Sequence, residues 1–350
     1  MLNSQALKRD RYIKMLAFLG ILIFFGWVIL KVENMLVSTL LASVLAYLMG
    51  PLVNAIERTG LKRHLAIVTS FVIVGFFLAL GITFAAPLIS GQLSNFQSDL
   101  PKYVEGSARI IRDIESKINS YIVIGDQFDL SSHAQQMIIA VTKSIFEDLP
   151  AIISKSVTTI LLAPFFTYFL LRDGQSFVRK LLRIVPNSIF ELTLSLHHEI
   201  NDQMGQFVRA RLFEALIVGI IVWIGLFALG FPYASVLASF AALANLIPYI
   251  GPIIGGVPAV GIAMINGNSS TEILIVILIY GLAQLIDIVF IIPLVVAKIV
   301  NLHPITVLVV IIIGAQLMGV TGMLISIPVA SALKVTLYSV YQHLTDFRTT

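Results

Sequence analysis

A single aspartate stands inside an apolar segment near the end of the chain. Asp287 lies well within the hydrophobic run at about 272–297. A carboxylate at that depth in a bilayer costs about 2.5–3.5 kcal/mol, so it normally faces a polar cavity or a partner. Gln284 and Tyr280 come three and seven residues earlier, which places all three side chains on one face of a helix. We therefore predict a site that binds a cation or a polar solute and can exchange a proton. The alternative is an aspartate that only hydrogen-bonds a neighbouring helix.

The stretch from Phe240 to Met264 contains several residues that break helices, although it is apolar enough for a bilayer. Each proline lacks an N–H group and crowds the carbonyl four residues earlier. Broken backbone at membrane depth is tolerated only inside protein or along a wet cavity, and it often marks a transport site. The alternative is a kinked structural helix whose glycines allow close packing. From this stretch we predict further site residues, which are Asn245, Pro248, Tyr249, Gly251 and Pro252.

Two arginines and a glutamate mark the start of another apolar run. Arg209, Arg211 and Glu214 precede or enter the run at 212–230, and we predict that they form a cytoplasmic entry or gate. Arg211 and Glu214 are three residues apart and can pair on a helix. Both arginines could instead simply anchor the cytoplasmic end of the span.

The composition is that of a polytopic all-α membrane protein. The chain has 350 residues, of which 58% are hydrophobic and 12% charged, about half the charged fraction of a soluble domain. Its basic residues lie at helix ends and in loops, which argues against a nucleic-acid partner. The absence of cysteine excludes disulfides and thiol catalysis. No phosphate-binding loop is present, and the histidines in His197-His198-Glu199 lack metal-site spacing, so we expect no cofactor, no metal and no enzyme activity.

The apolar runs give about eight hydrophobic segments, including the broken one. We expect three spans in residues 1–89, an extracytoplasmic helical region at 90–150, a fourth span at 151–171 and a cytoplasmic amphipathic arm at 172–211. A C-terminal transport core would follow at 212–337, with a tail at 338–350. Within this core we expect the fifth span, the broken segment at 240–264, a seventh segment and one long eighth segment at about 304–337.

Lysines and arginines gather in the N-terminus, the 51–64 loop and the 172–211 arm. This pattern predicts a cytoplasmic N-terminus, with 90–150 outside. The side of the C-terminus depends on whether the broken stretch crosses once or doubles back, and the late charges leave both possibilities open.

Several motifs in order resemble the autoinducer-2 exporter family. They are PFFTYFLLRDG at 164–174, NLIPYIGPIIGGVPA at 245–259, DIVFIIPLVVAKIVNLHP at 287–304 and SIPVA at 326–330, together with the fifth span. The resemblance covers most of residues 150–332. It implies a multi-pass protein of the bacterial inner membrane that forms homo-oligomers within the lipid bilayer. The family often has Asp-Asn where this chain has Asp287-Ile288, so one polar group of the expected site is missing.

Three functions follow as hypotheses. The first is a secondary transporter that exports a small polar solute, such as the quorum-sensing signal autoinducer-2, by alternating access. The second is a sodium(lithium)/proton antiporter in which Asp287 exchanges cation for proton. The third, of another class, is a membrane scaffold whose 90–150 and 172–211 regions bind partner proteins.

Overall fold

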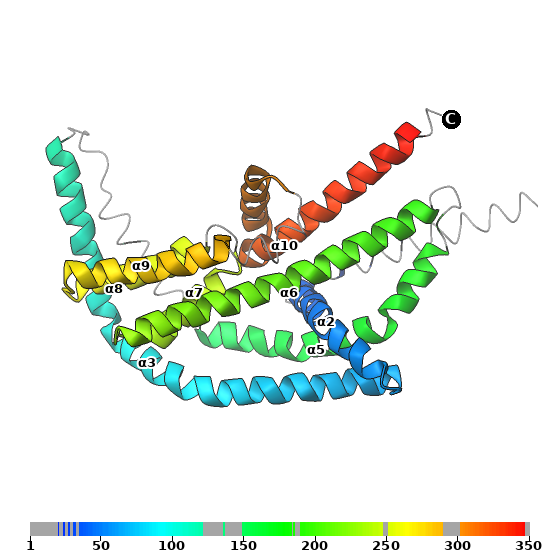
Figure 1. Ribbon diagram of the computed structural model, residues 1–350, viewed down its shortest axis with the longest axis horizontal. Coiled ribbons are helices and arrows are strands. Elements are labelled where there is room, and N and C mark those ends of the chain that lie inside the picture. Colours follow the sequence, from blue (N-terminus) through cyan, green and yellow to red (C-terminus); the bar gives the residue numbers. More distant parts are fainter. Residues whose placement is uncertain are drawn as a thin grey trace, which may run out of the picture. The chain divides into compact units, whose positions relative to one another are not determined.

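The computed structural model describes residues 35–121, 149–183, 190–247, 251–289 and 302–346, with a few isolated positions besides (Figure 1). Every regular element in these ranges is a helix. The helices are α2 (Met35–Glu57), α3 (Arg63–Tyr121), α5 (Leu149–Leu182), α6 (Phe190–Ala228), α7 (Ala234–Ala244), α8 (Gly251–Ile265), α9 (Ser270–Ile286) and α10 (Pro304–Asp346). Within the described ranges, four helices are long and apolar enough to cross a membrane, in α2, α3, α6 and α9. The prediction of an all-α polytopic membrane protein is confirmed.

The chain forms two compact units. The first comprises Met1–Ile73, Ile152–Gly205 and Ala330–Thr350, and the second comprises Val74–Ala151 and Gln206–Val329. In the first unit, the Thr167 hydroxyl of α5 donates to the Ala42 carbonyl of α2. The Arg63 guanidinium donates to the Leu171 carbonyl at 2.7 and 2.9 Å and pairs with Glu57.

The second unit includes residues 212–329 of the C-terminal region expected at 212–337. Small residues let its helices approach closely: a Cβ on Gly219 of α6 would lie 2.7 Å from the Ala242 Cβ of α7. A Cβ on Gly225 of α6 would likewise lie 2.6 Å from Ile279 Cγ2 of α9. Such contacts are typical of helices packed in a membrane, where backbones pack through small side chains.

The broken stretch folds into a helical hairpin. A Cβ on Gly251 would clash with the Ala244 carbonyl oxygen, and one on Gly255 would lie 3.0 Å from the Ala241 Cα. Later residues of α8 thus meet earlier residues of α7, so the two helices run antiparallel. Glycine is required at both positions because a side chain would push the helices apart.

The prediction that a proline leaves the carbonyl four residues earlier without a partner is wrong for Ala244. The Ala244 carbonyl is expected to lose its partner, yet it accepts from the Ile247 N–H at 2.9 Å. The chain tightens after α7 into turns of the i→i+3 kind, which satisfy the Leu243 and Ala244 carbonyls. Pro258 lies inside α8 without ending it, so the break is confined to the segment between Ala244 and Gly251.

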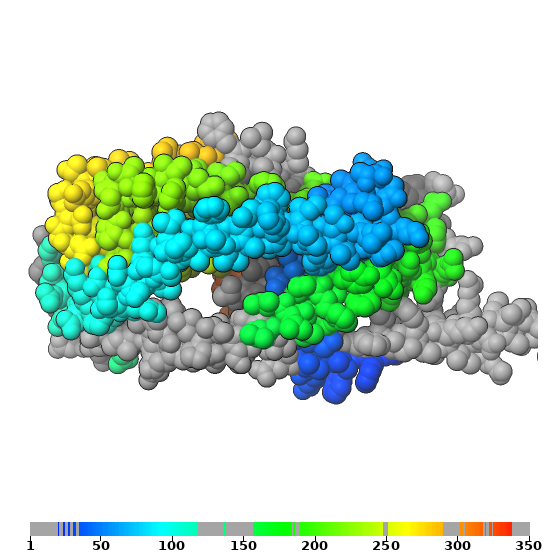
Figure 2. Space-filling model, turned by 90° about the horizontal axis from the view of Figure 1, so that it is seen from below, coloured from blue at the N-terminus to red at the C-terminus, as the bar shows by residue number. Residues whose placement is uncertain are grey.

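Helix α3 continues without a break from the expected third span into the expected extracytoplasmic region. Its 59 residues include Pro87 and Pro101, and they correspond to a helix about 90 Å long, three times the hydrocarbon thickness. Figure 2 shows it as a continuous band from light blue to cyan. Most of the remainder of the expected extracytoplasmic region, at 122–148, lies outside the described residues.

Two other expectations need correction. Residues 172–182 of the expected amphipathic arm continue α5 and are not a separate helix. The expected eighth segment is not one long span, because α10 turns back on itself: a Cβ on Gly314 would clash with the Gly322 carbonyl oxygen and lie 3.0 Å from the Ser326 Cβ. The turn lies at Gly319, whose φ of 60° is left-handed.

Candidate functional site

The centre of the candidate site is a cluster of three ionisable side chains, Arg211 and Glu214 of α6 and Asp287 at the end of α9. The Arg211 guanidinium donates to Glu214 Oε1, one helical turn away. The Glu214 and Asp287 carboxyl groups are close enough to interact electrostatically. Only 9% of Arg211, 1% of Glu214 and 3% of Asp287 is exposed. Charged groups buried to this degree are costly unless they are paired, so the three must be considered together.

The backbone changes at the residue that completes the cluster. Helix α9 starts with a capping box, in which Ser269 accepts from the Glu272 N–H and Glu272 accepts from the Ser269 N–H. It stays α-helical to Ile286 and then widens into a π turn at 287–289. Single π turns inside helices are frequent at functional sites. Here the wider turn accompanies the burial of Asp287, while the next side chain, Ile288, is 52% exposed.

The site offers hydrogen-bonding atoms that nothing in the described part of the chain satisfies. Among the described residues, the buried side-chain atoms without a partner are Arg211 Nε, Glu214 Oε2, Asn245 Nδ2, Tyr280 Oη and Asp287 Oδ1. Buried polar atoms are normally paired, so an unpaired one needs an explanation such as a ligand, an ion or water. All five belong to residues predicted from the sequence.

The structure places the other residues of the predicted α9 stripe beside this cluster. Tyr280 and Gln284 precede Asp287 on α9, and both side chains are half-buried. The Tyr280 ring packs on α8, where a Cβ on Gly256 would lie 3.4 Å from its Cδ1. This contact joins α9 to the second arm of the hairpin.

Asn245 lies at the tip of the hairpin and is 2% exposed. Ile247, two residues later, packs in one apolar cluster with Phe207 and Ala210 of α6. The tip therefore meets α6 next to Arg211. Gly251 is buried at the start of α8, and Pro252 beside it is half-buried.

Pro248 and Tyr249 fall outside the described residues. Arg209, also predicted at the entry, is half-buried on α6.

The largest difference from the sequence prediction concerns Arg211 and Glu214. Sequence reasoning assigns them to a cytoplasmic gate, whereas in the structure both interact electrostatically with the predicted binding residue Asp287. The three-residue spacing predicts the pair of Arg211 with Glu214, but it does not predict that the two lie near Asp287. Glu214 could have been identified, because it is an acid within an apolar run, as Asp287 is.

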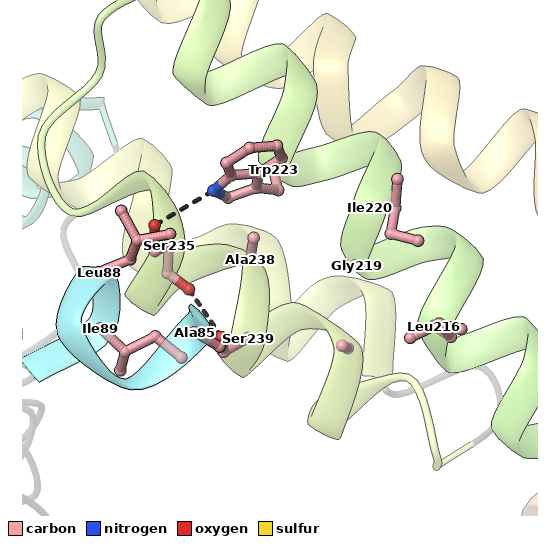
Figure 3. A pocket seen from close by; sticks show the side chains of 11 residues that line it. Ala85, Leu88, Ile89, Leu216, Gly219, Ile220, Trp223, Ser235, Ala238 and Ser239 are labelled. Carbon is pink, nitrogen blue, oxygen red and sulfur yellow. Dashed lines mark hydrogen bonds between the residues drawn. The ribbon is translucent and has the colours of Figure 1, made fainter. Parts of the chain in front are cut away.

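The second unit also contains an apolar cavity of about 340 Å³ between α3, α6 and α7 (Figure 3). Its few polar groups are already paired: the Trp223 Nε1–H donates to the Ser235 hydroxyl at 3.1 Å, and the Ser239 hydroxyl donates to the Ser235 carbonyl at 2.7 Å. Its other walls are aliphatic, including Leu88, Leu216 and Ile220. The cavity contains none of the ionisable cluster and offers nothing to bind a polar solute. Among the described residues, no group of three or more histidines and acids could hold a metal ion.

Comparison with known proteins gives the family. The sequence model described as "AI-2E family transporter" matches residues 15–342. "Putative transport protein YueF" of Bacillus subtilis (strain 168) is 26% identical over 318 residues, covering 87% of this chain and 84% of that protein. "Putative permease PerM" of Escherichia coli (strain K12) is 27% identical over 326 residues, covering 91% and 89% respectively. The chain belongs to the AI-2E family of membrane transporters.

Proposed function

We propose that this chain is a secondary transporter that exports a small polar solute, such as autoinducer-2, by alternating access. The buried cluster of Arg211, Glu214 and Asp287, with its unpaired polar atoms, carries this proposal. Transporters of this kind bind their substrates near mid-membrane, beside discontinuous helices. The hairpin tip next to α6 supplies such a discontinuity.

The chemistry of the unpaired atoms favours a neutral or weakly charged solute rich in hydroxyl groups. Arg211 Nε and Asn245 Nδ2 are donors, Glu214 Oε2 and Asp287 Oδ1 are acceptors, and the Tyr280 hydroxyl can act as either. A hydroxyl group both donates and accepts, so a compact polyhydroxylated molecule matches such a set. A purely apolar solute would leave every one of these atoms unsatisfied, at the cost of their desolvation.

One observation favours antiport of a sodium or lithium ion against a proton as a second candidate. Glu214 and Asp287 are buried carboxyl groups that interact with each other, and two neighbouring carboxyl groups can share one proton. Loss of that proton would leave two carboxylates facing one guanidinium, and a hard cation could then take the place of the proton.

Purified protein in liposomes separates these functions. We expect uptake of labelled autoinducer-2 into inside-out vesicles, and we expect Asp287→Asn to abolish it while the folded protein remains. Asp173→Asn serves as the control, because Asp173 is an exposed carboxylate that pairs only with its neighbour Arg172. Sodium-driven alkalinisation of the lumen that Asp287→Asn removes, without solute flux, would assign the site to antiport. Equal flux in Asp287→Asn and wild type would refute both assignments.

A further inference from the structure

One face of α3 contacts both ends of the α7–α8 hairpin. The contacting residues are Gln92, Phe96, Asp99, Lys102, Tyr103 and Gly106. Apart from Lys102 they recur at steps of four and three residues, so they form a single stripe along the helix. In Figures 1 and 2 this part of α3 runs beside the yellow-green and yellow elements of the hairpin.

The α7 end of the hairpin is held by two polar contacts. The Tyr233 hydroxyl, one residue before α7, donates to the Asp99 carboxylate. The Ser235 N–H donates to Gln92 Oε1 at 2.8 Å. That N–H belongs to the first turn of α7, where the helix offers no partner of its own, so the contact satisfies an otherwise free donor.

The α8 end is held by the next turns of the same stripe. The Lys102 ammonium donates to Asn266 Oδ1 at 2.6 Å, and the Tyr103 hydroxyl donates to the same oxygen at 3.4 Å. Gly106 allows close approach, because a Cβ there would lie 2.5 Å from Ile265 Cγ2. Asn266 follows directly after α8, so these contacts fix the point where the hairpin closes.

Three aromatic rings connect the two ends. The ring centroids of Phe96 and Tyr233 are 5.3 Å apart, those of Phe96 and Tyr103 are 5.9 Å apart, and those of Tyr103 and Tyr233 are 6.1 Å apart. These separations are within the range of favourable aromatic contacts. Tyr233, just before α7, and Tyr103, which contacts Asn266 just after α8, therefore belong to one aromatic cluster together with Phe96 of α3.

Tyr233 also adopts an unusual backbone. Its φ is 57°, and it is the only residue other than glycine with a positive φ among those that the structure describes. A bulky residue holds this conformation only when its surroundings impose it. The Asp99 contact and the two rings supply that constraint, so loss of the contact would let the turn before α7 relax.

We propose that this stripe of α3 is a hairpin clamp, which positions the α7–α8 hairpin by holding its two ends together and stays closed while the hairpin works. Asp99 and Tyr233 are then positioning residues, since they act on the site only through the hairpin. The clamp and the hairpin lie in the same compact unit, which supports the proposal that they move together. The expected effect of the clamp on solute flux rests on the function proposed above, whereas the closure of the clamp does not.

The closure is tested by thiol modification, because the chain has no cysteine of its own. Ile265 is half-buried and packs against Gly106 of α3, so a single Ile265→Cys should react faster when the clamp opens, and its modification rate reports changes in the opening equilibrium. We expect Tyr233→Phe, which keeps the ring, to speed modification about tenfold, as loss of a hydrogen bond to a charged group implies. Ser98→Ala is the control on α3, because that hydroxyl is exposed and donates only to Asn95 of its own helix. Equal rates in the Tyr233→Phe, Ser98→Ala and parent proteins would overturn the clamp, whether or not the protein transports the solute tested.

The positioning role is tested by locking the clamp covalently with the pair Gly106→Cys and Ile265→Cys. We expect Tyr233→Phe to lower solute flux, oxidation of the pair to restore it, and reduction to lower it again. The same disulfide in the otherwise unchanged chain should leave flux intact. Arrest of flux by that disulfide would show that the junction must open, which would overturn the proposal of a closed clamp.

Discussion

At the scale of single residues, the balance of charge around Asp287 decides whether the core is stable. Among the described residues, Arg211 is the cation that pairs with the buried Glu214 carboxylate, and its guanidinium also lies 5.7 Å from the Phe207 ring. Buried charges stabilise a protein little as a pair, but removing one partner leaves the other uncompensated.

We therefore expect Arg211→Met to lower the free energy of unfolding by about 3–5 kcal/mol, the cost of breaking a buried ion pair. Adding Glu214→Gln to that variant should recover much of the loss, because the uncompensated carboxylate is then gone. Arg172→Met provides the comparison, since Arg172 is half-exposed and pairs with exposed Asp173, and it should leave stability unchanged. Denaturant titration in detergent measures all three. A double variant less stable than Arg211→Met would contradict the charge argument.

Sequence reasoning at this scale found the individual groups but not their arrangement. The cost of an acid in hydrocarbon identifies Asp287, and the three-residue spacing predicts the pair of Arg211 with Glu214. The meeting of Glu214 with Asp287 depends on how α6 packs against α9, with Gly225 opposite Ile279. Helix periodicity within one segment contains no such information.

At the scale of elements, two hairpins depend on glycine where their arms cross. One is the α7–α8 hairpin, and the other is formed by α10, which turns back on itself at Gly319. Gly251 faces the Ala244 carbonyl oxygen, and Gly314 faces the Gly322 carbonyl oxygen, with no room for a Cβ in either case. Overpacking at such a contact forces the backbone apart and typically costs about 1–3 kcal/mol.

Gly251→Ala should accordingly open the α7–α8 hairpin and sharply reduce solute flux. Gly261→Ala lies on the same helix, where a Cβ meets nothing within 4 Å, and it should leave flux unchanged or slightly improve stability, because alanine favours helix. This comparison is made by measuring the solute flux and the thermal unfolding midpoint of both purified variants. Identical behaviour of the two variants would mean that the close contact at Gly251 has no role.

The first hairpin was partly predictable, whereas the second was not. Prolines and glycines crowd the 240–264 stretch, so a break there follows from backbone chemistry. Its reversal of direction depends on packing against α3 and α6. In α10 the turn at Gly319 lies in a continuous apolar run whose one proline, Pro328, comes later, so a single long helix is what the sequence pattern favours.

At the scale of the whole molecule, the hairpins lead to a prediction about membrane topology. A hairpin that doubles back returns the chain to the side from which it came. The loop after α6 and the loop before α9 both meet the same stretch of α3, at Asp99 and at Lys102. The two loops should therefore lie on one side of the membrane, which the basic-residue pattern predicts to be the outside.

Single cysteines at Ala228 and Asn268 test this topology in the cysteine-free chain. We expect a membrane-impermeant thiol reagent, added to intact cells, to modify both, because one residue ends α6 and the other precedes α9. Modification of one from outside and of the other only after permeabilisation would mean that the broken stretch crosses the membrane once.

The most direct test of the account is whether water and solute reach the face of α9 that carries Asp287. Gln284 is half-buried on that face, while its neighbour Leu285 is 59% exposed and should contact lipid. The decisive measurement is the rate at which an impermeant thiol reagent modifies Gln284→Cys and Leu285→Cys in membranes, with and without the transported solute. The account predicts modification of Gln284→Cys that the solute slows, and an inert Leu285→Cys. An unreactive Gln284→Cys, or equal reaction at both positions with no effect of the solute, would contradict a polar transport site at Asp287.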